Sequence, residues 1–368
     1  MNVVRTIKYK GVAFEKWVLQ MWQLMKVRFR LYNEDRLIKS KLTQKNVLTQ
    51  SEREQVKAFY SPYFKPKLTS HQFYKEKTGV FCVNYVPDYI WYGYIDPYYN
   101  DWKLDKYIDN KCYYHRIFPN VKMPQLFYYR LNGFWFDGKD NIVSEQKVRK
   151  FLSESNENCF LKMADSLSGC GYGVTFFAPS ENDISTLAHL LNSKDDMVIQ
   201  GAISQHQKLS AINDSSVNTV RILSLLCKDG TVKVYSSVLR IGRRGKKVDN
   251  ASSGGITCGI CPNGRLKKFA YNQRGNRFEK HPDSGFVFDE AEIPSYEKAV
   301  EMVKGIAPTV PHFRLVSWDI AIGDDGEPIF IEMNPAYGEL DFHQLNNGPI
   351  FGEDTEEVLE EVFGNRKK

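Results

Sequence analysis

The chain has 368 residues, 42% of them hydrophobic and 14% aromatic, which is enough for a sizeable core and excludes a disordered chain. The net charge of +6 is an N-terminal property: residues 1–50 hold eleven Lys and Arg against three Asp and Glu, and the rest holds 39 basic against 41 acidic residues. This distribution argues against a nucleic-acid-binding protein. The length allows two or three subdomains.

The cysteines do not form a secretory framework, because their number, seven, is odd and no signal peptide precedes them. We therefore expect a protein of the reducing cytoplasm. Cys258 and Cys261 form a Cys-x-x-Cys pair, but the second pair that a zinc site of this kind needs does not occur. We interpret the pair as structural.

Residues 12–38 are predicted to be helical, because large apolar side chains recur at three- and four-residue steps with Lys and Arg between them. Charges interrupt the run too often for a bilayer span. A basic helix with a Trp-rich face suits peripheral contact with an anionic membrane, here the inner membrane face. It equally suits a surface helix that packs on its own protein.

Residues 51–110 are predicted to begin with a helix and to continue in an aromatic-rich segment. Ser51 and Glu54 have the spacing of a capping box, with Ser51 as the N-cap. The many Tyr and Trp residues that follow suit either the wall of an acceptor pocket or a small irregular domain held together by aromatic packing.

A glycine-rich loop is predicted between two short strands over residues 160–163 and 174–177. Glycines allow a backbone to approach phosphates closely, and a lysine within the first strand, Lys162, is explained by pairing with a phosphate. The loop is not a P-loop, because no Gly-Lys-Ser/Thr follows it. Its small residues are Ser168, Gly169, Gly171 and Gly173.

The next apolar strand, over residues 197–203, breaks into polar residues at Gln200 and Gly201. A strand that ends this way is expected to leave free backbone groups near Ala202, which an adenine edge requires. Residues 217–227 and 231–241 then form a predicted hairpin around an Asp-Gly turn.

That hairpin carries two arginines in strand-like runs, Arg221 and Arg240. Each is explained either by a guanidinium that reaches out to solvent along an apolar stem or by one that faces phosphates. The polar loop over residues 242–255 follows, and its glycines and serines suit a mobile lid.

A second hairpin, over residues 318–335, combines apolar strands with three oxygen-bearing side chains. Glu332 and Asn334 share one face of their strand, because side chains alternate along a strand. Folding the hairpin about residues 323–327 brings Asp319 opposite residues 331–332. Two carboxylates and an amide are ligands that Mg²⁺ prefers, so we predict a metal site; solvated acidic strand ends are the alternative.

Taken in this order, these segments resemble the ATP-grasp superfamily, and most closely its sugar-transfer-associated, α-L-glutamate ligase-related branch. The resemblance covers roughly residues 105–345. It departs from the superfamily pattern at Gln200, where many members carry Glu. The matching segments are Asp109-Asn110-Lys111, Lys162, Gln200-Gly201, Asn218–Arg221, Leu239–Gly242, Val248–Asn250, Gly254–Ile256, His281–Gly285, Trp318-Asp319 and Ile331–Asn334.

The resemblance implies an α+β ATP-grasp fold in which two α+β subdomains clamp the nucleotide. We expect a helical, aromatic-rich N-terminal region over residues 1–104, a first subdomain with the glycine loop over 105–200, and a second with the metal site over 201–368. ATP and Mg²⁺ are the implied cofactors, with residues 200–202 as the hinge against adenine. Lys111 and Lys162 are the implied nucleotide lysines.

The resemblance also implies an amide-forming carboxylate–amine ligase that works through an acyl phosphate, with Arg240 and Arg221 stabilising the reacting groups. The branch name points to glycan or cell-surface polysaccharide biosynthesis and to a small-molecule or glycan-linked acceptor. The alternatives are a phosphotransferase acting on a sugar or small molecule and a non-catalytic ATP-binding protein.

Overall fold

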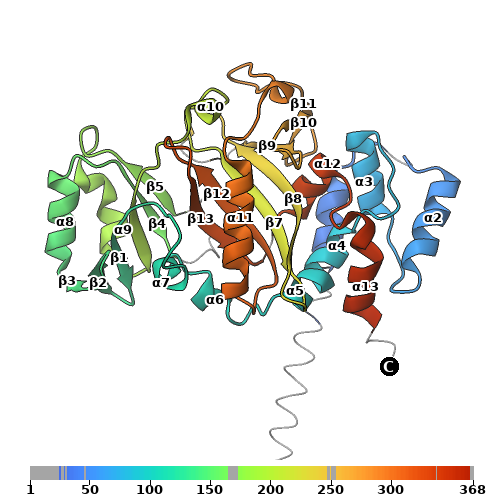
Figure 1. The fold of residues 1–368 in the computed structure, drawn as a ribbon, viewed down its shortest axis with the longest axis horizontal. Coiled ribbons are helices and arrows are strands. Elements are labelled where there is room, and N and C mark those ends of the chain that lie inside the picture. The colour runs from blue at the N-terminus through green and yellow to red at the C-terminus, as the bar shows by residue number, and fades with distance from the viewer. Residues whose placement is uncertain are drawn as a thin grey trace, which may run out of the picture. The chain divides into compact units, whose positions relative to one another are not determined.

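The computed structural model describes residues 25, 29, 31–44, 47–164, 173–246, 249, 254–336 and 338–364. The chain divides into two compact units, Met1–Tyr98 with Glu353–Lys368, and Tyr99–Gly352 (Figure 1). Residues 31–41 are helical, and most of the predicted helix over 12–38 lies outside the described residues. The predicted boundaries after residues 104 and 200 stay predictions.

The first unit is helical and is packed around aromatic rings. Tyr74 stacks on Tyr85 with ring centroids 4.7 Å apart, and Phe363 contacts Phe64 at 5.4 Å. The aromatic-rich segment therefore supplies a buried core in this unit, as the packing alternative predicted. Its helical elements are α2 (Gln50–Tyr60), α3 (Thr69–Thr78), α4 (Asp88–Ile90), the π-helical turn η1 (Trp91–Ile95) and α13 (Thr355–Phe363).

Helix α2 begins earlier than predicted, and the predicted N-cap Ser51 is wrong. Thr49 is the N-cap: its hydroxyl accepts from Glu52 N at 3.2 Å, and its own N–H donates to the Glu52 carboxylate at 2.7 Å. Both Thr49–Glu52 and Ser51–Glu54 fit the capping-box spacing. The helix takes the upstream box, which lets it start at Gln50 and bury Val56 and Tyr60.

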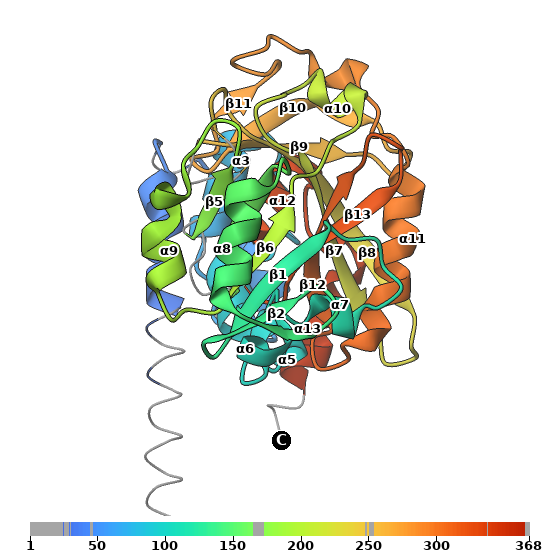
Figure 2. The same ribbon diagram turned by 90° about the vertical axis from the view of Figure 1, so that its left-hand side faces the viewer.

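The second unit holds two antiparallel sheets and the helices packed on them. The first sheet has six strands in the order β3-β2-β1-β6-β4-β5. Helices α8 (Glu145–Glu154) and α9 (Ala188–Asn192) cover one of its faces (Figure 2). Its strands are β1 (Leu126–Leu131), β2 (Phe134–Asp137), β3 (Ile142–Val143), β4 (Cys159–Met163), β5 (Val174–Phe177) and β6 (Met197–Gly201).

The second sheet has seven strands in the order β11-β10-β9-β8-β7-β12-β13. Helix α11 (Tyr296–Ile306) packs its apolar side against one face of this sheet. Helix α12 (Leu340–Asn347) contacts β8, β9 and β10. The strands are β7 (Thr219–Leu226), β8 (Val232–Ile241), β9 (Ile256–Ile260), β10 (Leu266–Asn272), β11 (Arg277–Phe278), β12 (Leu315–Ile322) and β13 (Pro328–Asn334).

Short helices and turns complete the described part of the chain. None of the helices there is long and apolar enough to cross a lipid bilayer. The remaining elements are α5 (Asp96–Tyr99), α6 (Asp105–Ile108), α7 (Tyr114–Ile117), α10 (Gln207–Ser210) and the short turns η3 (Ile184–Leu187), η5 (Phe288–Glu290), η6 (Ala307–Thr309) and η7 (Gly352–Asp354).

Both predicted hairpins of the second sheet are present. Strands β7 and β8 pair across a turn in which Gly230 has φ +86°. Strands β12 and β13 pair with Asp319 directly opposite Glu332, as the folding of the hairpin predicted. The pairing of β4 with β5 likewise confirms the two strands that flank the glycine loop.

Candidate active site

The seven-stranded sheet has one apolar face and one polar face, and the polar face carries the site. Along β12, Val316, Trp318 and Ile320 join the core beneath α11, so Asp319 points to the other side. Paired residues on antiparallel strands point to the same side. Asp319 pairs with Arg221 of β7 and with Glu332 of β13, so all three lie on the polar face.

Asp319 is the centre of this face and accepts hydrogen bonds from two buried arginines. Arg221 donates from Nε and Nη2, both at 2.7 Å, and Arg240 donates from Nη1 at 2.8 Å. Burial alone would raise the pKa of Asp319, but Arg221 and Arg240 outweigh it and hold the pKa at about 2. The arginines are paired and buried, so the alternative in which they reach out to solvent is wrong.

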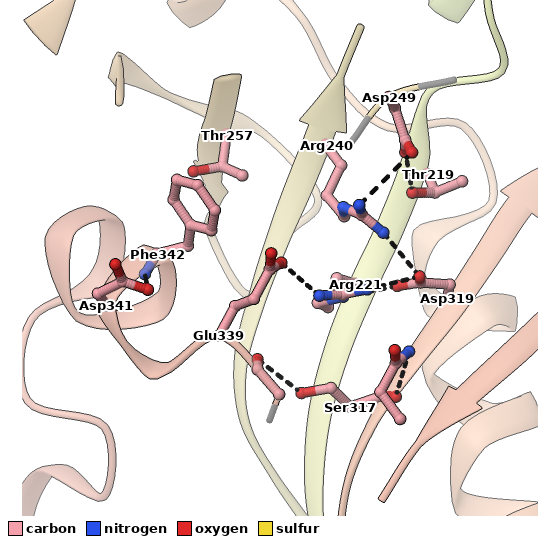
Figure 3. Close-up of polar contacts among 12 residues, drawn as sticks. Thr219, Arg221, Arg240, Asp249, Thr257, Ser317, Asp319, Glu339, Asp341 and Phe342 are labelled. Carbon is pink, nitrogen blue, oxygen red and sulfur yellow. Dashed lines mark hydrogen bonds and ion pairs between the residues drawn. The ribbon is translucent and has the colours of Figure 1, made fainter. Parts of the chain in front are cut away.

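Two further carboxylates engage the arginines (Figure 3). Arg221 Nη1 donates to Glu339, which caps the start of α12 with φ +59°, a strained value for a residue with a side chain. Arg240 Nη2 lies 3.6 Å from Asp249, which also accepts from the Thr219 hydroxyl. Sequence reasoning did not mark Glu339, and it marked Asp249 only within the matching segment Val248–Asn250 without a role, because nothing local identifies an acid that pairs with a distant strand.

Glu332 and Asn334 extend the polar face onto β13. Lys111 Nζ lies 3.0 Å from Glu332 Oε2. Burial acts to lower the pKa of Lys111, but Glu332 and Asp109 outweigh it and the pKa is raised. Asn334 Nδ2 donates to the Ser317 carbonyl at 3.2 Å, so the amide oxygen is the atom of Asn334 that could bind a cation. The structure therefore brings Asp319 and Glu332 together, as the hairpin predicted, and adds Lys111 beside Glu332.

Lys162, on β4 of the six-stranded sheet, lies near Glu332 and Lys111. It is the fourth residue of β4, and burial lowers its pKa to about 8, although Glu332 opposes the shift. Lys111 lowers this pKa further, because the two cations lie close together. Among the described residues, no carboxylate lies within ion-pair distance of Lys162. A half-buried lysine that lies near another lysine and has no carboxylate partner in the described part of the chain favours a bound anion.

The glycine loop is only partly visible. Ser168, Gly169 and Gly171 lie outside the described residues. Gly173 has φ +82°, and a Cβ at this position would lie 2.3 Å from the Met163 side chain. The end of the loop therefore requires glycine for two independent reasons.

The backbone of the predicted hinge, residues 200–202, forms more hydrogen bonds than expected. Gln200 is the fourth residue of β6 and pairs with β1 and β4 on its two sides. The N–H of Gly201 donates to the Gln125 carbonyl at 2.8 Å, and that of Ala202 to the Asn158 carbonyl at 2.9 Å. The expectation of a free backbone is therefore wrong for these two N–H groups, because neighbouring loops continue the strand pairing.

The polar loop after β8 is anchored at its start. Asp283 accepts from Arg243 Nε at 2.7 Å and from Arg244 N at 2.9 Å, and His281 Nε2 lies 3.0 Å from the Gly242 carbonyl. The His281–Gly285 segment of the resemblance therefore holds the start of this loop in place. Much of the predicted lid, residues 247, 248 and 250–253, lies outside the described residues.

The donor set suits a hard divalent cation. Both carboxylate oxygens of Asp319 accept hydrogen bonds from arginines. Oδ1 accepts only one of these bonds and keeps a lone pair. Glu332 is one-quarter exposed, and Asn334 adds a neutral oxygen. These are oxygen ligands of the kind Mg²⁺ binds. Nowhere in the described part of the chain do three or more His, Cys, Asp or Glu cluster around a metal position; the predicted set has two carboxylates and an amide.

Solved structures of several ligases are similar to this chain at a low level. The ATP-grasp ligase PsnB, complexed with precursor peptide PsnA2 and AMPPNP, shares 13% identity with a TM-score of 0.42, over 72% of this chain and 62% of PsnB. An L-amino acid ligase from Bacillus licheniformis shares 13% with a TM-score of 0.40, over 69% and 47%. D-cycloserine synthetase DcsG shares 14% with a TM-score of 0.39, over 70% and 72%.

The alignments thus span less than two thirds of the PsnB chain and of the Bacillus ligase. No curated protein matches the sequence. A family model described as sugar-transfer associated ATP-grasp matches residues 93–359, which include both sheets and every charged residue of the polar face. The chain therefore belongs to the sugar-transfer associated ATP-grasp family and has the α+β ATP-grasp fold.

Proposed function

We propose that the chain is an ATP-dependent carboxylate–amine ligase. The observation that carries the proposal is the pair Lys111, from the turn before α7, and Lys162, from β4, which lie on the same side as Asp319 and Glu332. Two half-buried ammonium groups beside two carboxylates match a polyphosphate bound with a divalent cation. Membership in the ATP-grasp family supports the same ligand.

In the proposed reaction, Lys111 and Lys162 bind phosphate oxygens of ATP, and the glycine loop excludes water above them. Asp319, Glu332 and Asn334 would hold Mg²⁺, which when bound neutralises charge on the β- and γ-phosphates. A substrate carboxylate oxygen attacks the γ-phosphorus, the bond to the β–γ bridging oxygen breaks, and ADP leaves with an acyl phosphate formed.

The second half of the proposed reaction forms the amide. The amine nitrogen attacks the acyl carbon, phosphate leaves with the bonding electrons, and the nitrogen loses a proton. Arg221 and Arg240 lie where the carboxylate side of the reaction is expected, next to the predicted metal ligands. Their fixed positive charges stabilise the oxygen that becomes negative during the attack.

The test is ADP release across a panel of carboxylic acids and amines, with mass analysis of the product. We expect release that requires both an acid and an amine, and a product with the mass of an amide. Lys162→Met should reduce release at least about a hundred-fold by removing a phosphate contact in a buried site. Lys298→Met, which removes a surface lysine 2.6 Å from Glu327, is the matched control and should leave release unchanged. A phosphorylated product formed without amine contradicts the ligase assignment.

We further propose an acceptor linked to a glycan, presented at the inner membrane face. The family description, which associates these proteins with sugar transfer, supports the glycan. Met25, Phe29 and Tyr32 support the membrane: they recur at helical spacing and are 57%, 68% and 60% exposed. Binding to anionic phosphatidylglycerol vesicles should fall in Phe29→Glu and be absent with neutral phosphatidylcholine vesicles. Equal binding of both proteins to anionic vesicles contradicts the membrane contact.

A further inference from the structure

Helix α12 lies on the polar face of the seven-stranded sheet, on the side of the arginines away from β13. Asn346 Nδ2 donates to the Thr257 hydroxyl at 2.8 Å, and Thr257 pairs with Arg240. His343 contacts Ser236, which lies four residues before Arg240 on β8 and so points to the same side. The helix therefore forms a wall beside the charged residues.

His343 is fixed in a single tautomer by its neighbours. Asn347 Nδ2 donates to Ser236 Oγ at 2.8 Å, and Ser236 Oγ lies 2.8 Å from His343 Nδ1. No other described residue accepts the Ser236 hydroxyl proton, so Ser236 donates it to Nδ1 and the imidazole carries its own proton on Nε2. Burial lowers the pKa of His343 to about 3, with Arg221 lowering it further, so the ring is neutral at physiological pH.

The Nε2–H group of His343 is buried and has no hydrogen-bond partner among the described residues. The side chain as a whole is 1% exposed. A buried donor that lacks a partner is destabilising by about 1–3 kcal/mol and indicates a group that is satisfied in another state. His343 lies four residues after Glu339, whose side chain reaches Arg221, so His343 is on the side of α12 that faces Arg221.

The groups that surround this edge select the ligand. Arg221 and Arg240 are cations, and the His343 Nε2–H is a neutral donor, so the common complement is an oxygen anion. Glu339 lies one helical turn before His343 and already contacts Arg221. Among the carboxylates that pair with Arg221 or Arg240, that of Glu339 is the most exposed, at 29%. Its position shows that Arg221 can bind a carboxylate from the side of α12.

We propose that His343 binds the carboxylate substrate, its Nε2–H donating to a substrate oxygen held beside Arg221 and Arg240. This inference rests on the proposed ligase function and adds the position of the acid to it. The acid lies between the arginines and α12, with the predicted nucleotide lysines on the far side of Asp319. Its carboxyl group displaces or joins Glu339 on Arg221.

Two substitutions separate this role from a structural one. His343→Asn keeps a group that reaches Ser236 but removes the donor at the Nε2 position. His343→Gln keeps a donor near the Nε2 position but loses the geometry toward Ser236. Acetate serves as the carboxylate probe and methylammonium as the control cation. Saturation-transfer NMR measures their binding to the whole chain with and without MgADP.

We expect acetate, and not methylammonium, to bind the unmodified chain and to shift the Nε2–H resonance of ¹⁵N-labelled His343. Affinity for acetate should fall about ten-fold or more in His343→Asn and stay within about three-fold in His343→Gln, as loss of one hydrogen bond to a charged group predicts. Absence of acetate binding, or the reverse order of the variants, overturns the inference. MgADP affinity, unchanged in both variants, tests the ligase proposal separately: if MgADP does not bind the unmodified chain, the ligase proposal fails.

Discussion

Substitution of the two predicted metal-binding carboxylates should have different effects on stability, although both should abolish catalysis. Asp319→Asn and Glu332→Gln each remove one negative charge with little change in shape. They differ in their surroundings: the Asp319 side chain is 3% exposed and that of Glu332 is 26% exposed. Asp319 also accepts from two arginines, whereas Glu332 forms an ion pair with Lys111 alone among the described residues.

The magnitude follows from what each change leaves behind. Asp319→Asn leaves the guanidinium groups of Arg221 and Arg240 close together in the interior without the carboxylate that they share. Removing one partner of a buried ion pair destabilises a protein by about 3–5 kcal/mol. Glu332→Gln breaks one ion pair whose side chains are 10% and 26% exposed, so it should lower the free energy of unfolding by less than Asp319→Asn, about 1–2 kcal/mol.

Urea unfolding followed by tryptophan fluorescence gives the free energy of unfolding, and ADP release at rising Mg²⁺ concentration gives the activity. We expect Asp319→Asn to unfold at clearly lower urea than Glu332→Gln, and both variants to lose ADP release. An Asp319→Asn protein within about 1 kcal/mol of the original refutes the role of Asp319 as the centre of the arginine pair. Full ADP release by Glu332→Gln refutes its assignment as a metal ligand.

Three further predictions concern the rest of the chain. Burial lowers the pKa of His71 from 6.5 to about 4, so the unfolded chain takes up this proton first as pH falls. Stability is therefore lost as pH falls from 6.5 to 4, and the loss amounts to about 2 kcal/mol at pH 5; urea unfolding at pH 7 and pH 5 should show this loss, and His71→Gln should lack it. Thr49→Ala should lower the unfolding free energy by about 1 kcal/mol and Ser51→Ala by much less, and the opposite order contradicts the N-cap. Gly173→Ala should destabilise the chain more than Gly79→Ala in thermal unfolding, because both have positive φ but only Gly173 lacks space for a Cβ; equal losses contradict this.

The parts of the site that were predictable are those with strong local patterns. The hairpin around Asp319 and Glu332 was predictable because turn residues separate two apolar runs, which brings Asp319 opposite residues 331–332. A register shift between Asp319 and Ile320 then pairs Asp319 with Glu332. Lys162 was recognisable as a charge within a strand. Lys111 was different, because only the family resemblance marked it, and its contact with Glu332 joins residues more than two hundred positions apart in the sequence.

The parts that were not predictable depend on tertiary pairing. Glu339 and Asp249 follow no periodic pattern, and their roles come from the strands that place Arg221 and Arg240 within reach. The Gly201 N–H was expected to be free, but a loop before β1 continues the sheet and bonds it. The local sequence predicts which polar groups a strand carries. The partner of each group lies on another strand or loop, which the local sequence does not identify.

The pairing of Lys111 with Glu332 limits how the proposed reaction can begin. Each of these residues is predicted to contact a different ligand, the lysine a phosphate and the carboxylate a cation, but without ligands they neutralise each other at 3.0 Å. Lys162 has no such partner among the described residues, so it can receive phosphate directly. Lys111 becomes available for phosphate only when Glu332 acquires another positive partner. The nucleotide and its cation should therefore bind together, and affinity for ADP should depend on Mg²⁺ more strongly in the original chain than in Glu332→Gln.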